Sequence, residues 1–163
     1  MVNLHGHAAG NGGHGQGEPT AATGPLLLGE VAVRGGGHYV AGRATLDGGV
    51  MIDLSLMKAI HVDPRARTAR AQGGVTWGEY NRETQVHALA STGGVISTTG
   101  ISGLTLGGGL GWLQGKHGLA IDNLRAAQLV TAEGQVVTTS NDEEPELFWR
   151  SVAAAAISAS QPR

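Results

Sequence analysis

Two glycine-rich segments carry the residue types best suited to holding a ligand. The first is Arg34-Gly-Gly-Gly-His38, which follows the short apolar run at 31–33. Three successive residues without Cβ let the backbone adopt positive φ and let its N–H groups converge on an anion such as a pyrophosphate. The pattern predicts a strand that leads into a ligand-binding loop followed by a histidine. A tight turn between two strands is the alternative interpretation of this loop.

The second segment runs from Gly93 to Trp112 and carries serine and threonine hydroxyls between its glycines. A glycine run by itself is a weak signal, but two such segments in one small chain support each other. Together they predict two walls around one extended cofactor.

Composition excludes several classes of protein. The chain has 163 residues, 28 of them glycine and only six aromatic, which predicts one domain with a light core. Its net charge is −2 and it has no run of Lys or Arg, so neither nucleic acid nor a membrane surface is an expected partner. It has no cysteine, which excludes disulfides, thiolate metal sites and cysteine nucleophiles. No stretch resembles a membrane span or a signal peptide, which favours a cytoplasmic location.

The remaining pattern predicts the elements that position the glycine segments. Thr76 and Glu79 are spaced for reciprocal capping of a helix that carries Trp77, Tyr80, Thr84 and Ala88 near one face. The expected elements are a buried strand over 50–55, a hairpin of 60–62 with 68–72, a helix over 77–89, a short helix within 104–114, a hairpin of 124–131 with 136–139, and an acidic helix start at 142–146. Residues 1–29 are expected to be a disordered His/Gly-rich tail, 30–150 the domain, and 151–163 an Ala-rich tail.

Three other interpretations fit less well. His5, His7 and His14 have no carboxylate at a useful spacing, which disfavours a metal site. Lys116 lacks the upstream glycine spacing of a P-loop, and His117 stands where that motif needs Ser or Thr. A nicotinamide-binding Rossmann domain is disfavoured because no G-x-G-x-x-G follows a strand.

A family resemblance emerges when the motifs are taken together, in order, from about Val31 to Trp149. The chain resembles the FAD-binding domain of the berberine-bridge-enzyme-like FAD-linked oxidases, which have the PCMH-type fold. The motifs that carry the resemblance are Arg34-Gly-Gly-Gly-His38 with Ala41-Gly42, Gly73-Gly-Val-Thr-Trp-Gly78, Thr99-Gly-Ile-Ser-Gly-Leu-Thr-Leu-Gly-Gly-Gly-Leu-Gly-Trp112, Lys116-His-Gly-Leu119, Asp122-Asn123 and Pro145-Glu-Leu-Phe-Trp149.

This resemblance implies an α+β domain of two small α/β subdomains, incomplete here, with FAD held between them. It implies that His38 bonds covalently to the 8α carbon of the flavin. Ser102 stands where some members carry a second, cysteine linkage, so a single linkage is expected. The residues expected to contact the cofactor are Gly35, Gly36, Gly37, His38, Thr99, Gly100, Gly103, Gly108, Gly109, Asp122 and Asn123.

The implied chemistry is oxidation of a small organic substrate by hydride transfer to flavin N5, with oxygen as the usual acceptor. The family continues into a substrate domain that supplies the catalytic base, and the chain resembles a fragment truncated at both ends. A non-catalytic remnant or binding module without flavin is the alternative hypothesis. The residues indicate neither the substrate nor the oligomeric state.

Overall fold

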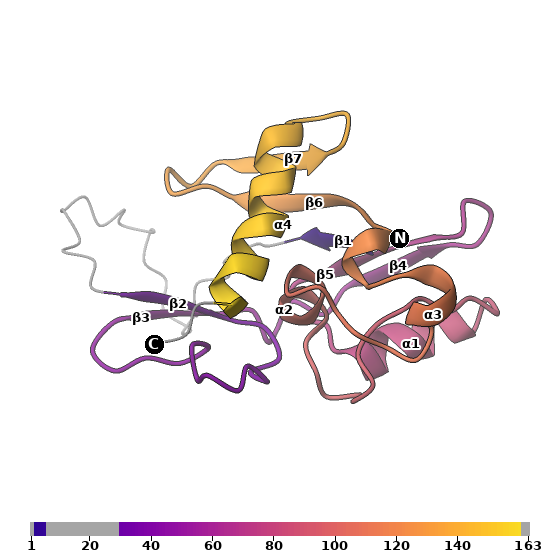
Figure 1. Cartoon of the computed structure of the whole chain (residues 1–163), viewed down its shortest axis with the longest axis horizontal. Helices are drawn as coiled ribbons and strands as arrows, with labels where there is room; N and C mark the ends of the chain where they lie inside the picture. The colour runs from indigo at the N-terminus through magenta and orange to yellow at the C-terminus, as the bar shows by residue number, and fades with distance from the viewer. Residues whose placement is uncertain (1, 6–29, 161–163) are drawn as a thin grey trace, which may run out of the picture.

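The computed structural model describes residues 2–5 and 30–160, with side chains described over 30–152. Helices and strands alternate irregularly along the chain, as expected for an α+β domain (Figure 1). The elements are β1 Val2–His5, β2 Val31–Arg34, β3 Val50–Asp53, β4 Ile60–Asp63, β5 Thr68–Gln72, α1 Trp77–Gln85, α2 Ile101–Leu106, α3 Gln114–His117, the 3₁₀ turn η1 Ile121–Asn123, β6 Leu124–Val130, β7 Val136–Ser140 and α4 Pro145–Ser160.

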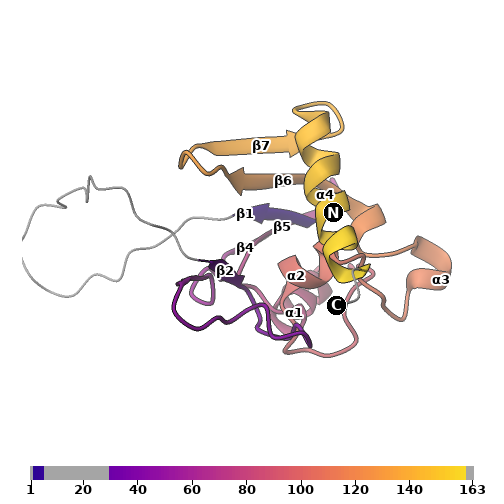
Figure 2. The same cartoon turned by 60° about the vertical axis from the view of Figure 1, so that its left-hand side comes forward.

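The strands form two separate sheets. The larger has the order β4-β5-β1-β6-β7, and Figure 2 shows its strands side by side with β7 at the top. β2 pairs with β3 in parallel in a second sheet. β1 lies at the centre of the larger sheet and pairs in parallel with β5 and β6. The expectation of disorder over 1–29 therefore does not hold at Val2–His5, where two neighbouring strands supply the hydrogen bonds; residues 6–29 lie outside the described part of the chain.

Both predicted hairpins are confirmed. β4 and β5 pair antiparallel from Ile60↔Ala71 to Asp63↔Thr68, and β6 and β7 pair from Ala126↔Ser140 to Val130↔Val136. The tight turns need left-handed backbone, which Gly134 adopts with φ 80° in the second hairpin. Turn chemistry and alternating patterns are local properties, so the sequence alone predicts these units well.

The core lies between the larger sheet and the helices. Trp77 and Tyr80 of α1 are almost fully buried and meet edge to face with ring centroids 5.4 Å apart. Phe148 of α4 joins the same apolar cluster, and α4 packs against β7 and α2 (Figure 1). Gly93 also packs on the Trp77 indole, since a Cβ at this glycine would lie 2.1 Å from Cζ3. Part of the glycine excess therefore makes room for a tryptophan.

Helix α1 begins with the predicted capping interaction. One carboxylate oxygen of Glu79 accepts hydrogen bonds from the Thr76 N–H and hydroxyl, both at 2.8 Å, and from Lys58 Nζ at 2.7 Å. Burial raises the pKa of the Glu79 carboxyl, but the hydrogen bonds from Lys58 and Thr76 outweigh burial and lower the pKa from 4.5 to about 2. Glu79 thus ties the helix start to the loop before β4.

Substitution of Glu79 by Gln should reduce both stability and its acid dependence. The folded pKa is lower than the unfolded value, so the ionised carboxyl stabilises the fold above pH 4.5, and this contribution is lost as the pH falls towards about 2. We expect a loss of about 1 kcal/mol at pH 7, the size of a capping interaction. Thermal unfolding between pH 2 and 7 measures both effects, with the more exposed Glu83→Gln as control. Parallel pH curves for Glu79→Gln and the parent would contradict the assignment.

Other expectations need correction. All four residues of β3 are exposed, although this segment was expected to be buried, because β3 belongs to a sheet of only two strands in which Ala32 of β2 is the one buried residue. Helix α1 ends at Gln85 rather than near residue 89, and Ala88 is exposed with φ 53°. The expected helix within 104–114 instead appears as the short helices α2 and α3. Residues 151–160 continue α4, where an Ala-rich tail was expected.

None of the helices in the described segments is both long and apolar enough to cross a membrane.

Candidate functional site

The two glycine segments meet backbone to backbone. The loop after β2 places Gly36 against Gly100, which precedes α2. A Cβ at Gly36 would lie 2.2 Å from the Gly100 nitrogen, and a Cβ at Gly100 would lie 2.4 Å from the Gly36 nitrogen. Real Cβ atoms do not approach backbone this closely, so both positions require glycine. The glycines were predicted to let a ligand approach the backbone. The structure shows that glycine at these two positions lets the two glycine segments contact each other.

The neighbouring residues lock this junction. A Cβ at Gly35 would lie 2.9 Å from Ser102 Oγ, and that hydroxyl donates a 2.8 Å hydrogen bond to the Gly73 carbonyl. The Ser102 hydroxyl therefore joins α2 to the loop after β5, and Gly35 lies behind the junction. The Ile101 N–H donates to the Val75 carbonyl at 2.8 Å, which fixes the start of α2 on the same loop.

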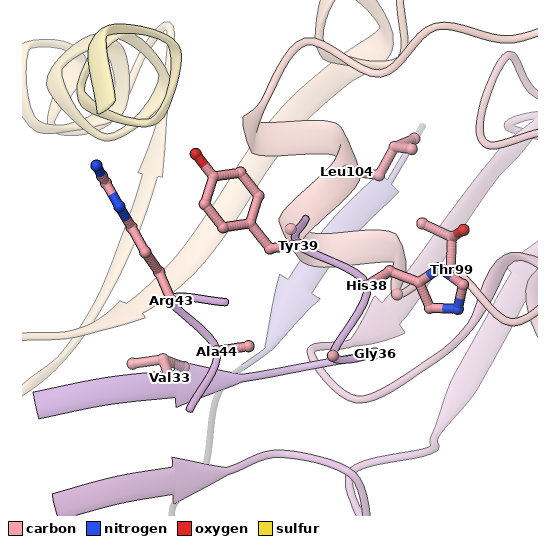
Figure 3. A pocket seen from close by; sticks show the side chains of 11 residues that line it. Val33, Gly36, His38, Tyr39, Arg43, Ala44, Thr99 and Leu104 are labelled. Atoms are coloured by element: carbon pink, nitrogen blue, oxygen red, sulfur yellow. The ribbon is translucent and has the colours of Figure 1, made fainter. Parts of the chain in front are cut away.

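A pocket of about 360 Å³ opens beside the junction (Figure 3). His38 and Thr99 lie on one side of it, and Tyr39 and Arg43 lie on the other. The residues that line it come from β2, the first glycine loop and the start of α2; they are Val33, Gly36, Gly37, His38, Tyr39, Arg43, Ala44, Thr99, Gly100, Gly103 and Leu104. Six of the predicted residues thus surround one space, although His38 and Thr99 are 61 positions apart in the sequence.

The pocket carries features suited to an anion. Gly37 has φ +69°, a conformation that glycine adopts readily, and Arg34 folds over it, so that a Cβ there would lie 3.2 Å from Arg34 Nε. Arg43 supplies the guanidinium that lines the pocket itself. A Cβ built at Gly103 meets nothing within 4 Å, so this face of α2 is open to close approach. Guanidinium groups and exposed glycine backbone are the usual partners of phosphate oxygens.

His38 is oriented by a side chain from the opposite segment. Its Nε2 lies 2.8 Å from the Thr98 hydroxyl oxygen. The two residues are 60 positions apart, so the contact exists only because the glycine segments meet. The imidazole is exposed, as a group that reacts with a bound ligand must be.

The structure does not bring four predicted residues to this pocket. Gly108 and Gly109 have φ +99° and +78°, and their carbonyls accept from Ile121 and Ala120. Asp122 accepts a 2.8 Å hydrogen bond from the Leu119 N–H. Asn123 donates to the carbonyls of His117 and Leu119. Gly108 and Gly109 hold the loop after α2 against the connection between α3 and β6, to which Asp122 and Asn123 belong. Gly35 is the fifth predicted residue outside the lining.

Sequence reasoning missed Tyr39 and Arg43. Both follow His38 within five positions, and Arg43 carries a positive charge shortly after an anion-binding loop. That charge was the signal that could have identified it. Tyr39 gave no comparable signal, because an aromatic residue beside a loop is equally consistent with packing.

The fold and the pocket define a cofactor-binding α+β domain with two glycine walls. Residues 29–140 match the FAD binding domain family, and the chain belongs to it. Over 74% of this chain, its sequence is 48% identical to (R)-6-hydroxynicotine oxidase of Paenarthrobacter nicotinovorans. Over the same share of this chain, it is 46% identical to an FAD-linked oxidoreductase of Aspergillus terreus. The predicted family and its PCMH-type fold are thereby confirmed.

Solved structures agree with these relatives. The crystal structure of 6-hydroxy-D-nicotine oxidase from Arthrobacter nicotinovorans matches 77% of this chain with a TM-score of 0.74 and 47% identity, and the match covers 28% of that protein. Berberine-bridge-enzyme-like 1 of Physcomitrella patens matches 77% with a TM-score of 0.70 and 33% identity, over 28% of its length. The two sequence relatives are covered over 26% and 24% of their lengths, so the chain spans about a quarter of the proteins that it resembles.

Proposed function

We propose that this chain binds FAD between its two glycine segments as part of a flavin-dependent oxidoreductase that oxidises a small organic molecule, with oxygen as acceptor. One observation carries this proposal: both glycine segments, two cationic or nucleophilic side chains and an open pocket meet in one place. The pocket has the fit expected for part of an extended dinucleotide, since its volume lies in the lower part of the usual range of about 300–1,000 Å³ for such sites.

The residues in and behind the pocket have different roles in binding. Gly36 and Gly37 line the pocket with backbone, the open side of Gly103 offers close approach to phosphate oxygens, and the Arg43 guanidinium complements their charge. Gly35, Gly108, Gly109, Asp122 and Asn123 act behind this wall by fixing the loops that present it. Bound FAD would supply the hydride acceptor, and the protein positions it.

His38 is the proposed covalent attachment site for the flavin. Three observations support it: the side chain lines the pocket, it is exposed, and it is held at one ring nitrogen only by a residue of the opposite wall. A neutral imidazole with one nitrogen in a hydrogen bond retains the other for reaction. Ser102 is engaged with Gly73 and makes no second linkage. The substrate and its catalytic base belong to the whole oxidoreductase, of which this domain is one quarter by the length of its relatives.

The visible absorption spectrum of the purified chain tests this proposal. The protein is expressed with excess FAD and the spectrum is recorded before and after acid precipitation. We expect a yellow protein whose colour remains with the precipitate, because a covalent flavin resists acid. Colour that is released into the supernatant would support FAD binding but contradict the covalent bond. A colourless protein would contradict FAD binding by this chain.

A further inference from the structure

We infer that Thr98 is a positioning residue for His38, holding its Nε2 so that Nδ1 faces the flavin. This inference rests on the proposed covalent attachment. The observation behind it is the 2.8 Å contact between the Thr98 hydroxyl and His38 Nε2. Within the described part of the chain, no hydrogen bond involves Nδ1 among those that the structure defines for this side chain.

The two ring nitrogens of an imidazole are not equivalent. In a neutral imidazole one nitrogen carries the proton and the other carries a lone pair, and only the lone pair can form a bond to carbon. The Thr98 hydroxyl can accept a hydrogen bond from Nε2–H or donate one to an unprotonated Nε2. We assign it the acceptor role, in which the lone pair is at Nδ1. In either role the contact limits rotation of the ring.

The attachment step balances with oxygen as the oxidant. The new bond joins Nδ1 to the 8α carbon, and the C–H bond that it replaces breaks. One proton comes from that carbon and one from the imidazole, and the two electrons pass through the flavin to dioxygen, which forms hydrogen peroxide. The proton on Nε2 is the one that the imidazole gives up, and it passes to solvent, because His38 and Thr98 are both exposed.

Thr98 is well placed for a clean substitution. Its side chain is exposed, so it contributes nothing to the buried core. The turn that contains it is held by the backbone, through the hydrogen bond from the Thr99 N–H to the Ile96 carbonyl at 3.1 Å. Thr98→Val removes the hydroxyl at nearly constant volume, and Thr98→Ser retains the hydroxyl while removing a methyl group.

The experiment follows covalent flavin over time in the full chain after FAD is added to flavin-free protein, using fluorescence of the acid precipitate. We expect Thr98→Val to form the covalent flavin about 5-fold more slowly, the factor given by one ordinary hydrogen bond, with unchanged noncovalent FAD binding. Thr98→Ser should restore the parent rate. Equal rates for Thr98→Val and the parent would overturn the inference.

A second readout does not depend on flavin. Nitrogen-15 NMR of labelled histidine, with the His38 signals identified by their loss in His38→Ala, reports the proton on each ring nitrogen. We expect the parent and Thr98→Ser to hold the proton on Nε2, and Thr98→Val to show a larger share on Nδ1. A parent protein with its proton on Nδ1 would overturn the inference even where covalent flavin forms. Absence of covalent flavin from the parent would contradict the proposed attachment, and the NMR result would still decide the role of Thr98.

Discussion

Substitution of His38 by Ala should abolish covalent flavin while leaving noncovalent FAD binding in place. The imidazole is the nucleophile in the proposed bond, and alanine offers no atom that can replace it. The glycine junction and Arg43 do not depend on the imidazole, because Gly36 and Gly100 meet through their backbones. The measurements are acid-precipitable flavin fluorescence, the mass of the intact protein, and FAD affinity from fluorescence quenching.

The matched control for this experiment is His61→Ala. His61 is exposed and lies on β4, away from the lining of the pocket. The His61→Ala substitution also removes an imidazole, and we expect it to have no effect on flavin attachment. Covalent flavin that persists in His38→Ala would contradict the assignment of this residue. Covalent flavin lost equally from both variants would point to a general effect on folding.

Substitution of Gly100 by Ala should separate the two glycine walls and destabilise the domain. Its Cβ would lie 2.4 Å from the Gly36 nitrogen, and backbone cannot move aside as the end of a flexible side chain can. We expect a loss of about 3 kcal/mol, the upper part of the range for overpacked sites, and a Tm lower by about 10 °C. FAD binding should weaken strongly, because the pocket exists only while the walls meet. Thermal unfolding and flavin fluorescence measure the two effects.

Two glycines supply the controls. A Cβ at Gly115 in α3 or at Gly103 in α2 would meet nothing within 4 Å. Gly115→Ala should therefore leave both stability and FAD binding close to the parent. Gly103→Ala should leave stability unchanged yet weaken FAD binding, because Gly103 faces the pocket. A Gly100→Ala protein as stable as Gly115→Ala would refute the close contact of the two walls, and full FAD affinity in Gly103→Ala would argue against close approach at α2.

Local patterns predicted the local structure. The capping pair Thr76 and Glu79 marks the start of α1 at Trp77, and both hairpins follow from alternating apolar residues around turn residues. The end of α1 was predicted less well, because the chain turns at Ala88 into the segment that packs on Trp77. Exposure of β3 also escaped prediction, since an apolar run does not reveal which elements will cover it.

The sequence by itself determined the family and the two glycine segments, because motifs at fixed spacing carry that information, and the family resemblance led to the prediction for His38. Only the tertiary structure decided which glycines share one pocket and which fix remote loops. All four glycines look alike in the sequence, but a Cβ at Gly36 or Gly100 would meet the backbone of the other glycine segment. A Cβ at Gly108 or Gly109 would instead meet side chains near residues 104 and 119–120. The Thr98 contact to His38 likewise joins residues 60 positions apart. Such juxtapositions depend on how sheet and helices pack, which no local pattern encodes.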